Sequence, residues 1–240
     1  MALAILCCAT AAAAVTATPG TKEAAAAAHP RPAVVELFTS QGCSSCPPAE
    51  TFLGELAQRP DVLALAFHVD YWDDLGWRDR FASSQATQRQ SVYAKSLRRS
   101  SVYTPQIVID GRADYVGSDR KAVGVALSRQ RTGVPVGLSV RAGEVLIDLQ
   151  AQKGAASSDV LLVAYLRQTA SSIGRGENAG RTVREFNVVR ALHTLGRWEG
   201  GAQSFRAQVA SLPADATDVA VLLQPLGQGA IVGAAATTLR

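Results

Sequence analysis

The chain has 240 residues, of which 48% are hydrophobic and 18% are charged. This composition is typical of a globular protein with a substantial buried core, and it excludes a mainly disordered chain. The net charge of +4 is small for this length, and the arginines stand singly or in pairs. A nucleic-acid groove needs massed basic residues with interleaved aromatic side chains, so we expect no nucleic-acid partner.

The first segment, residues 1–17, is apolar, carries no charge and ends in small residues. It looks like the apolar part and cleavage site of a secretory signal peptide without the usual basic start; a disordered tail is the alternative. It is too short and too rich in alanine to span a membrane. Residues 18–32 have the composition of a linker. We therefore expect a secreted or periplasmic protein, with residues 1–32 as signal peptide and linker and no stable membrane insertion after cleavage.

Removal of this leader takes Cys7 and Cys8 with it. The mature chain then has two cysteines, Cys43 and Cys46, in an oxidising compartment.

The first elements surround this cysteine pair. Residues 34–38 are rich in β-formers, and residues 49–58 place their apolar side chains on one helical face, with Glu50 off that face. Residues 62–67 are apolar throughout, as in a strand covered on both sides. Strand, helix and strand form a βαβ unit, which places the cysteine pair where the first strand turns into the helix.

The following elements complete an α/β domain at residues 33–133. In chain order they are an aromatic and acidic segment at 68–80, a helix at 84–97 capped by Ser83 or Ser84, a strand at 106–109, a return strand at 115–116 and a helix from Ser118 to about residue 130. Asp110-Gly111 between the two strands is a strong hairpin signal. The predicted order is β-α-β-α-β-β-α.

From residue 135 the pattern changes to short apolar or alternating runs between turn residues. The expected strands are residues 136–140, 145–149, 160–166, 205–209 and 219–223, with 231–235 as one more. In this part only residues 188–195 fit a helix. We expect a small all-β, sandwich-like subdomain at residues 134–240, packed on the first domain.

The cysteine pair carries the predicted chemistry. Unpaired N–H groups at a helix N-terminus favour a thiolate, which is the nucleophile in disulfide exchange. Cys43 precedes the helix, so we expect solvent to reach it, and Cys46 lies one turn on, where it can resolve a mixed disulfide. The pattern predicts a thiol–disulfide oxidoreductase that acts on a protein or small thiol or disulfide and needs no cofactor.

Alternative interpretations stay open. The pair is a structural disulfide if the protein is a non-catalytic binding module. Zinc would need histidines beside the sulfurs, and nothing in the spacing brings His68 and His193 together, so no metal ligand is assigned. Copper(I) needs only two thiolates, which makes a copper carrier the better metal hypothesis. A triad of Ser40 or Ser44 with His68 and Asp70 lacks the sequence pattern around a catalytic serine.

A resemblance to the thioredoxin fold superfamily covers residues 33–131. It is carried by Cys43-Ser44-Ser45-Cys46 at the strand-to-helix turn, by Thr104-Pro105 before a strand, and by the Asp110-Gly111 hairpin. It implies that Pro105 is cis and lies against the cysteine pair, that the backbone of Thr104 holds an extended substrate, and that residues 68–99 are a helical insertion.

Two departures from thioredoxins concern the site. Gly42 stands where they have tryptophan, and Glu36 is seven rather than six positions before Cys43. Glu36 therefore either reaches the pair through an extra loop residue or faces elsewhere.

Residues 71–77 form either a capping loop or one wall of a cleft beside the cysteines, where ligands of parallel sheets bind. In the second case Tyr71 and Trp72 join Thr104, Pro105 and Gln106 as substrate-binding residues.

Nearly all of the mature chain is similar to a narrower group, the secreted bacterial proteins catalogued as domain of unknown function 1223 (DUF1223). The residues that carry this similarity are 36–48, 68–73, 75–77, 103–106, 176–178 and 187–189. The resemblance implies a fold and leaves function to be argued from the site.

Overall fold

A computed structural model describes residues 29–239, so the predicted signal peptide, with Cys7 and Cys8, lies outside the described residues. Within this range the protein is a mixed α/β structure with three α-helices, α1 (Pro47–Leu56), α2 (Ser84–Ser96) and α3 (Arg120–Leu127), and a short 3₁₀ turn, η1 (Val209–Ser211). No helix in this range is long and apolar enough to cross a membrane.

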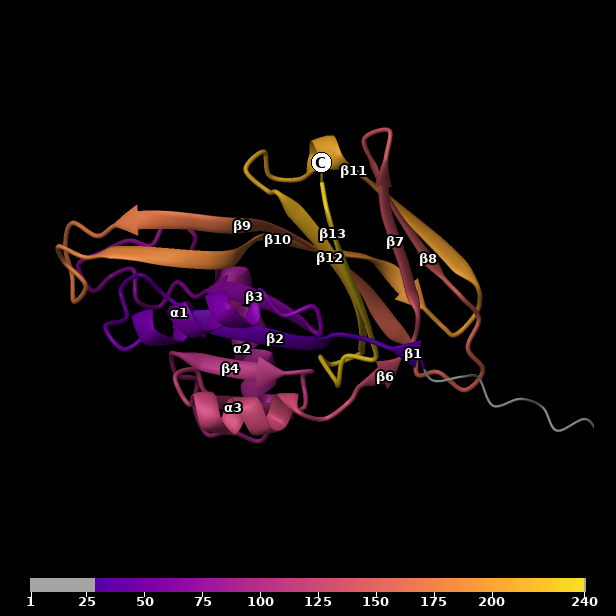
Figure 1. The fold of residues 1–240 in the computed structure, drawn as a ribbon, viewed down its shortest axis with the longest axis horizontal. Coiled ribbons are helices and arrows are strands. Elements are labelled where there is room, and N and C mark those ends of the chain that lie inside the picture. The colour runs from indigo at the N-terminus through magenta and orange to yellow at the C-terminus, as the bar shows by residue number, and fades with distance from the viewer. Residues whose placement is uncertain (1–28, 240) are drawn as a thin grey trace, which may run out of the picture.

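One eight-stranded sheet organises the described part of the chain (Figure 1). In spatial order its strands are β13 (Gly233–Thr238), β12 (Asp218–Pro225), β9 (Ser158–Ser172), β10 (Thr182–Trp198), β3 (Val62–His68), β2 (Ala33–Thr39), β4 (Gln106–Ile109) and β5 (Ala113–Val116). A second sheet holds β11 (Gln203–Gln208), β8 (Glu144–Leu149) and β7 (Val136–Arg141), and β1 (His29–Pro30) pairs with β6 (Thr132–Gly133).

The first half has the predicted order β2-α1-β3-α2-β4-β5-α3. Alternate side chains of β2 point to opposite faces of the sheet. Val35 and Leu37 pack with α1 and α3, whereas Val34 and Phe38 pack with α2. The last helix begins later than expected, because Asp119 rather than Ser118 caps it by accepting a hydrogen bond from the N–H of Ala122.

The β-rich half is not a separate layer packed on the first. Strands β9, β10, β12 and β13 continue the main sheet, and β10 joins β3 through a parallel pair at Val188 and Ala66. The helix considered at residues 188–195 is therefore wrong, since these residues belong to β10. The sandwich-like part lies where β7 and β8 close a hydrophobic core over β9 and β12.

The hairpin of β9 and β10 positions the site. It extends along α1, whose Gly54 has no room for a side chain, because a Cβ there would lie 2.6 Å from the ring of Phe186 (Figure 1). The turn of the hairpin thereby reaches the loop that carries the cysteines.

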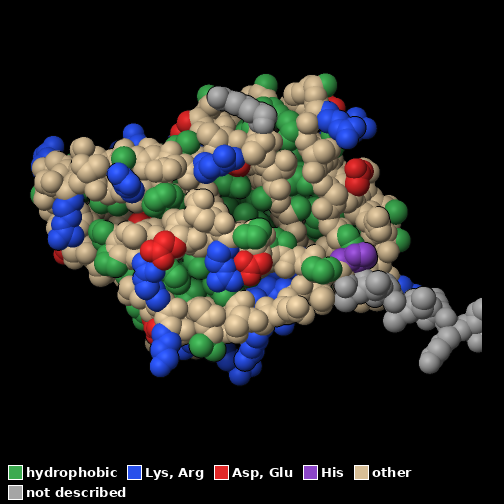
Figure 2. Space-filling model, viewed as in Figure 1, with side chains coloured by type: hydrophobic (Ala, Val, Ile, Leu, Met, Phe, Trp, Pro, Cys, Tyr) green, Lys and Arg blue, Asp and Glu red, His purple; other side chains and the backbone are tan. Residues whose placement is uncertain are grey.

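On the face seen in Figure 2 the basic side chains stand in separate groups.

Candidate functional site

Cys43 and Cys46 form a disulfide in the loop between β2 and α1, with their Cα atoms 5.4 Å apart. Cys46 is the N-cap residue of α1, and its carbonyl accepts hydrogen bonds from the N–H groups of Ala49 and Glu50. Proline at the start of α1 fits this geometry, since the first helical N–H groups have no partner within the helix. The predicted position of the pair at the strand-to-helix turn is confirmed.

The expected exposure of Cys43 is wrong. Cys43 is 0% and Cys46 is 1% exposed, whereas Ser44 and Ser45 between them are exposed. The sequence pattern places Cys43 before the helix, but it does not reveal which later segments cover the loop.

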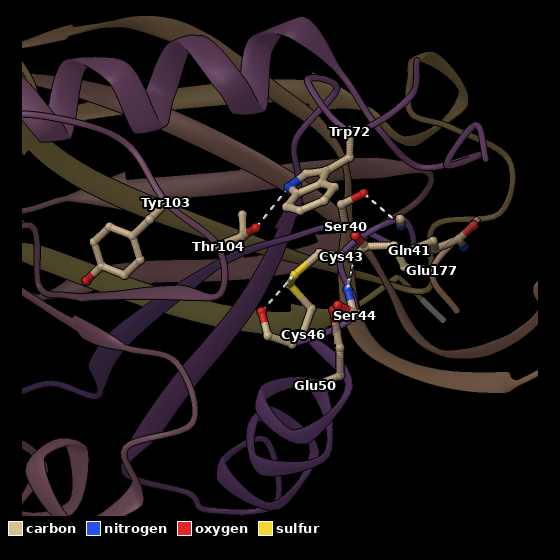
Figure 3. Close-up of a disulfide and its surroundings, with 12 residues drawn as sticks. Ser40, Gln41, Cys43, Ser44, Cys46, Glu50, Trp72, Tyr103, Thr104 and Glu177 are labelled. Carbon is tan, nitrogen blue, oxygen red and sulfur yellow. Dashed lines mark hydrogen bonds between the residues drawn. A yellow bond between two sulfur atoms is a disulfide. The ribbon is translucent and has the colours of Figure 1, made fainter. Parts of the chain in front are cut away.

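Trp72 is the first residue that shields Cys43 from solvent. Its indole Nε1 donates a hydrogen bond to Thr104 Oγ1 at 2.9 Å, and Figure 3 shows the ring standing beside Cys43. A Cβ at Gly42 would lie 3.2 Å from the Cβ of Trp72, so the glycine allows this close approach. The Thr104–Pro105 peptide is cis, as the thioredoxin resemblance implies.

The second cover is the turn between β9 and β10. The side-chain amide of Asn178 donates to the carbonyl oxygens of Gln41 and Cys43 at 3.0 and 2.9 Å, and Glu177 accepts a hydrogen bond from the N–H of Ser44 at 3.2 Å (Figure 3). This glycine-rich turn looks like a tight structural loop in the sequence, where nothing local indicates its contact with the cysteine loop.

The two other residues expected to bind substrate differ in their exposure to solvent. Tyr71 is partly exposed, and its hydroxyl donates to Gln90 Oε1. Gln106 is buried in β4, where its amide bonds Gln90 and Asp114, so the structure does not place it within reach of a substrate.

Glu36 does not line the gap beside the disulfide. It faces α2, where its carboxylate accepts a 2.6 Å hydrogen bond from Arg89 and bonds the hydroxyl of Tyr93. The helical pattern of residues 49–58 places Glu50 off the apolar face of α1, so nothing in the sequence indicates that this side chain is buried. Glu50 is 2% exposed, and it lines a small gap together with Cys46.

The same gap is lined by His68, which ends β3, and by Glu185 of β10. His68 Nδ1 lies 2.7 Å from Asp79 Oδ2, and His68 Nε2 lies 3.9 Å from Glu50 Oε1. Pairing with Asp79 leaves no triad with Asp70, whose carboxylate instead accepts from Thr87 Oγ1.

Burial and charge shift the titration of this cluster. Burial raises the pKa of Glu50 to about 7, against the opposing attraction of His68. Burial alone would lower the pKa of His68, but the carboxylates of Asp79, Glu50 and Glu185 together raise it to about 9. The disulfide therefore lies beside a buried cluster of titratable side chains.

Comparison with known proteins identifies the family. A crystal structure of a protein from Agrobacterium tumefaciens is 33% identical and superimposes with a TM-score of 0.77, covering 89% of this chain and 97% of that one. HBP35 of Porphyromonas gingivalis is 13% identical with a TM-score of 0.63, covering 88% and 76%, and shares the fold alone. No curated protein matches the sequence. The profile described as "Protein of unknown function (DUF1223)" matches residues 34–224, so the chain belongs to the DUF1223 family.

Proposed function

We propose that the protein is an exported thiol–disulfide oxidoreductase with a thioredoxin-like domain, in which Cys43 exchanges with substrate and Cys46 resolves. The observation that carries this proposal is the Cys43–Cys46 disulfide at the N-terminus of α1, between β2 and α1. A disulfide that closes so short a loop removes little conformational entropy from the unfolded chain, so stability alone is a weak reason for its presence.

The exchange consists of two substitutions at sulfur. A substrate thiolate attacks Sγ of Cys43, the Cys43–Cys46 bond breaks, and Cys46 leaves as a thiolate. A second substrate thiolate then attacks the substrate sulfur of the mixed disulfide and releases Cys43. The substrate dithiol becomes a disulfide and the protein pair is reduced; the reverse sequence reduces a substrate. The positive end of the α1 dipole favours the thiolate, although Pro47 and Pro48 have no N–H to offer and the N–H groups of Ala49 and Glu50 donate to the carbonyl of Cys46.

Access to Cys43 requires movement of Trp72. One hydrogen bond, from the indole to Thr104, holds the cover on that side, and such a bond contributes about 1 kcal/mol. Displacement of the indole would free Thr104 next to Pro105 for an extended substrate chain, with Tyr71 at the margin of the opening.

A trapping experiment tests this function. Cys46→Ser retains the nucleophile and removes the resolving thiol. The Cys43 thiolate attacks a substrate disulfide and one substrate sulfur leaves as a thiolate, so we expect this variant to accumulate mixed disulfides with a disulfide-containing peptide or with disulfide-bonded exported proteins. Cys43→Ser is the matched control. We expect it to accumulate no mixed disulfides, because it lacks the nucleophile. Equal trapping by both variants, or by neither, contradicts the proposal.

Burial of the pair favours a second candidate, a non-catalytic binding module with a structural disulfide. Both sulfur-bearing residues are inaccessible, and Asn178 ties the loop to the β9–β10 turn. In that case neither variant traps a partner, and the disulfide resists a reductant in the folded protein.

A further inference from the structure

The gap beside Cys46 contains buried polar atoms that lack hydrogen bonds of normal geometry. The carboxylate oxygens of Glu50 and the Nε2 of His68 are such atoms: their polar neighbours are the hydroxyl of Thr39, which interacts with the Glu50 carboxylate, and each other, with Nε2 3.9 Å from Glu50 Oε1. Buried polar groups are nearly always satisfied by protein, water or an ion, so these three atoms need an explanation. They point to the same gap, which Glu185 and Cys46 also line.

Water does not explain them. The gap has no volume for a water-sized sphere. A water molecule needs about 2.7–3.0 Å from each polar partner, whereas Zn²⁺ lies about 2.0–2.2 Å from nitrogen and oxygen ligands. Two such ligands of one ion are at most about 4.2 Å apart. The observed 3.9 Å between His68 Nε2 and Glu50 Oε1 lies within this limit.

The surroundings suit a cation. Among the described residues that line the gap, none is Lys or Arg, while two carry carboxylates. Opening the disulfide adds the thiolate of Cys46. A thiolate and two carboxylates outweigh the single positive charge of a protonated His68, and a divalent ion that displaces the proton from His68 Nε2 balances them.

His68 is oriented as a metal ligand. Its Nδ1 bonds Asp79 Oδ2, and Asp79 is itself held by the N–H groups of Gln41 and Phe81. Metal-binding histidines commonly use their second nitrogen in this way, which fixes the ring and leaves Nε2 for the ion. Carboxylate oxygens of Asp79 and Glu185 lie within 4.8 Å of a His68 ring nitrogen and of each other.

We infer that the reduced protein binds one zinc-like divalent ion through Cys46 Sγ, Glu50 and His68 Nε2. Glu185 is the candidate fourth ligand, and its two carboxylate oxygens accept hydrogen bonds from Gln41 and Ser171 in the oxidised protein. The disulfide form lacks the sulfur ligand and releases the ion. The inference rests on the proposed function only in that the disulfide must open, and Cys43→Ser removes even this requirement because it leaves Cys46 as a free thiol. The nitrogen and oxygen ligands distinguish this site from a copper(I) pair on two thiolates.

The test is metal retention by the whole mature chain. Cys43→Ser, the phosphine-reduced wild type and the oxidised wild type are equilibrated with Zn²⁺, desalted and analysed for bound metal. We expect one equivalent of zinc in the first two and none in the oxidised protein. Cys46→Ser, Glu50→Gln and His68→Gln, each in the Cys43→Ser background, should weaken binding at least tenfold. The matched controls Glu55→Gln, on the exposed side of α1, and His193→Gln should bind as before.

Cobalt(II) gives a second readout that does not depend on the folding of the ligand variants. Cobalt-loaded Cys43→Ser should have a thiolate-to-cobalt charge-transfer absorption. Failure of folded Cys43→Ser to retain zinc, or cobalt binding without this absorption, overturns the inference. Zinc retained without loss in folded Glu50→Gln and His68→Gln also overturns it. Zinc binding is measured in Cys43→Ser and mixed-disulfide trapping in Cys46→Ser, so the two results can fail independently.

Discussion

At the scale of single residues, a buried carboxyl group, Glu50, lies beside the disulfide of the described residues and faces His68 at 3.9 Å. Glu50 is buried on the side of α1 that meets His68. Glu36, for which the sequence leaves two orientations open, is bound by Arg89 on the other face of the sheet. Side chains alternate between the two faces of a strand, and in β2 this alternation places Glu36 on the α2 side with Val34 and Phe38, so the loop does not bring it to the cysteines.

Glu50 makes stability depend on pH. The unfolded chain loses this proton near 4.5 and the folded, metal-free protein near 7, so the folded state binds the proton more tightly. The stability that protonated Glu50 gives to the folded state is therefore fully present below about pH 4.5 and is lost as pH rises towards 7. We expect Glu50→Gln to be more stable than wild type above about pH 7 by up to about 3 kcal/mol, and by much less at about pH 4.

Urea unfolding of the oxidised proteins in the presence of a chelator measures this difference. Glu55→Gln is the control, because its carboxylate is exposed and paired with Arg120. A Glu50→Gln advantage that stays constant with pH would mean that Glu50 does not titrate in this range.

At the scale of elements, the segment after β3 acts as a cover. Residues 69–83 leave the sheet at His68 and return to α2, and on the way Trp72 reaches Thr104 while Trp77 donates to Gln41 Oε1. The sequence leaves residues 71–77 as either a capping loop or one wall of a cleft. The structure has them as a capping loop, and a cleft would form only if Trp72 moves as proposed above.

Removal of the cover should speed reduction. We expect Trp72→Ala to raise the rate at which a phosphine reduces the Cys43–Cys46 disulfide by about tenfold, the effect of losing about 1.4 kcal/mol from the opening step. Trp77→Phe removes a hydrogen bond to the same loop but leaves Trp72 in place, so its rate should stay near that of wild type. Equal rates for all three proteins would show that Trp72 does not control access.

At the scale of the whole molecule, the two halves share one of the three hydrophobic clusters of the described residues. Leu161 and Val163 of β9 pack in the same cluster as Val34 and Phe38 of β2. A break after residue 133 would expose this face of the sheet and the edge of β3.

We therefore expect residues 29–133, expressed alone, not to form a stable fold. The full mature chain should instead unfold in one transition, with tryptophan fluorescence and far-ultraviolet circular dichroism coinciding. A soluble fragment with cooperative unfolding and protected Cys43 would contradict this and would support the division at residues 133 and 134.

Much of the first half could be predicted from the sequence because its signals are local. The βαβ pattern and the Asp110-Gly111 turn fix the order of elements, and both turn residues have positive φ as such a hairpin requires. The junction of Val188 with Ala66 could not be predicted, since parallel pairing between distant segments leaves no local pattern. The burial of Cys43 and Glu50 depends on the same long-range contacts.

The most direct test of the redox proposal is the reduction potential of the Cys43–Cys46 couple in the folded protein, measured by equilibration with glutathione. For an exchange enzyme we expect a value between about −120 and −270 mV, the range of known thiol–disulfide oxidoreductases. A value below about −300 mV would identify a structural bond and contradict the proposed function.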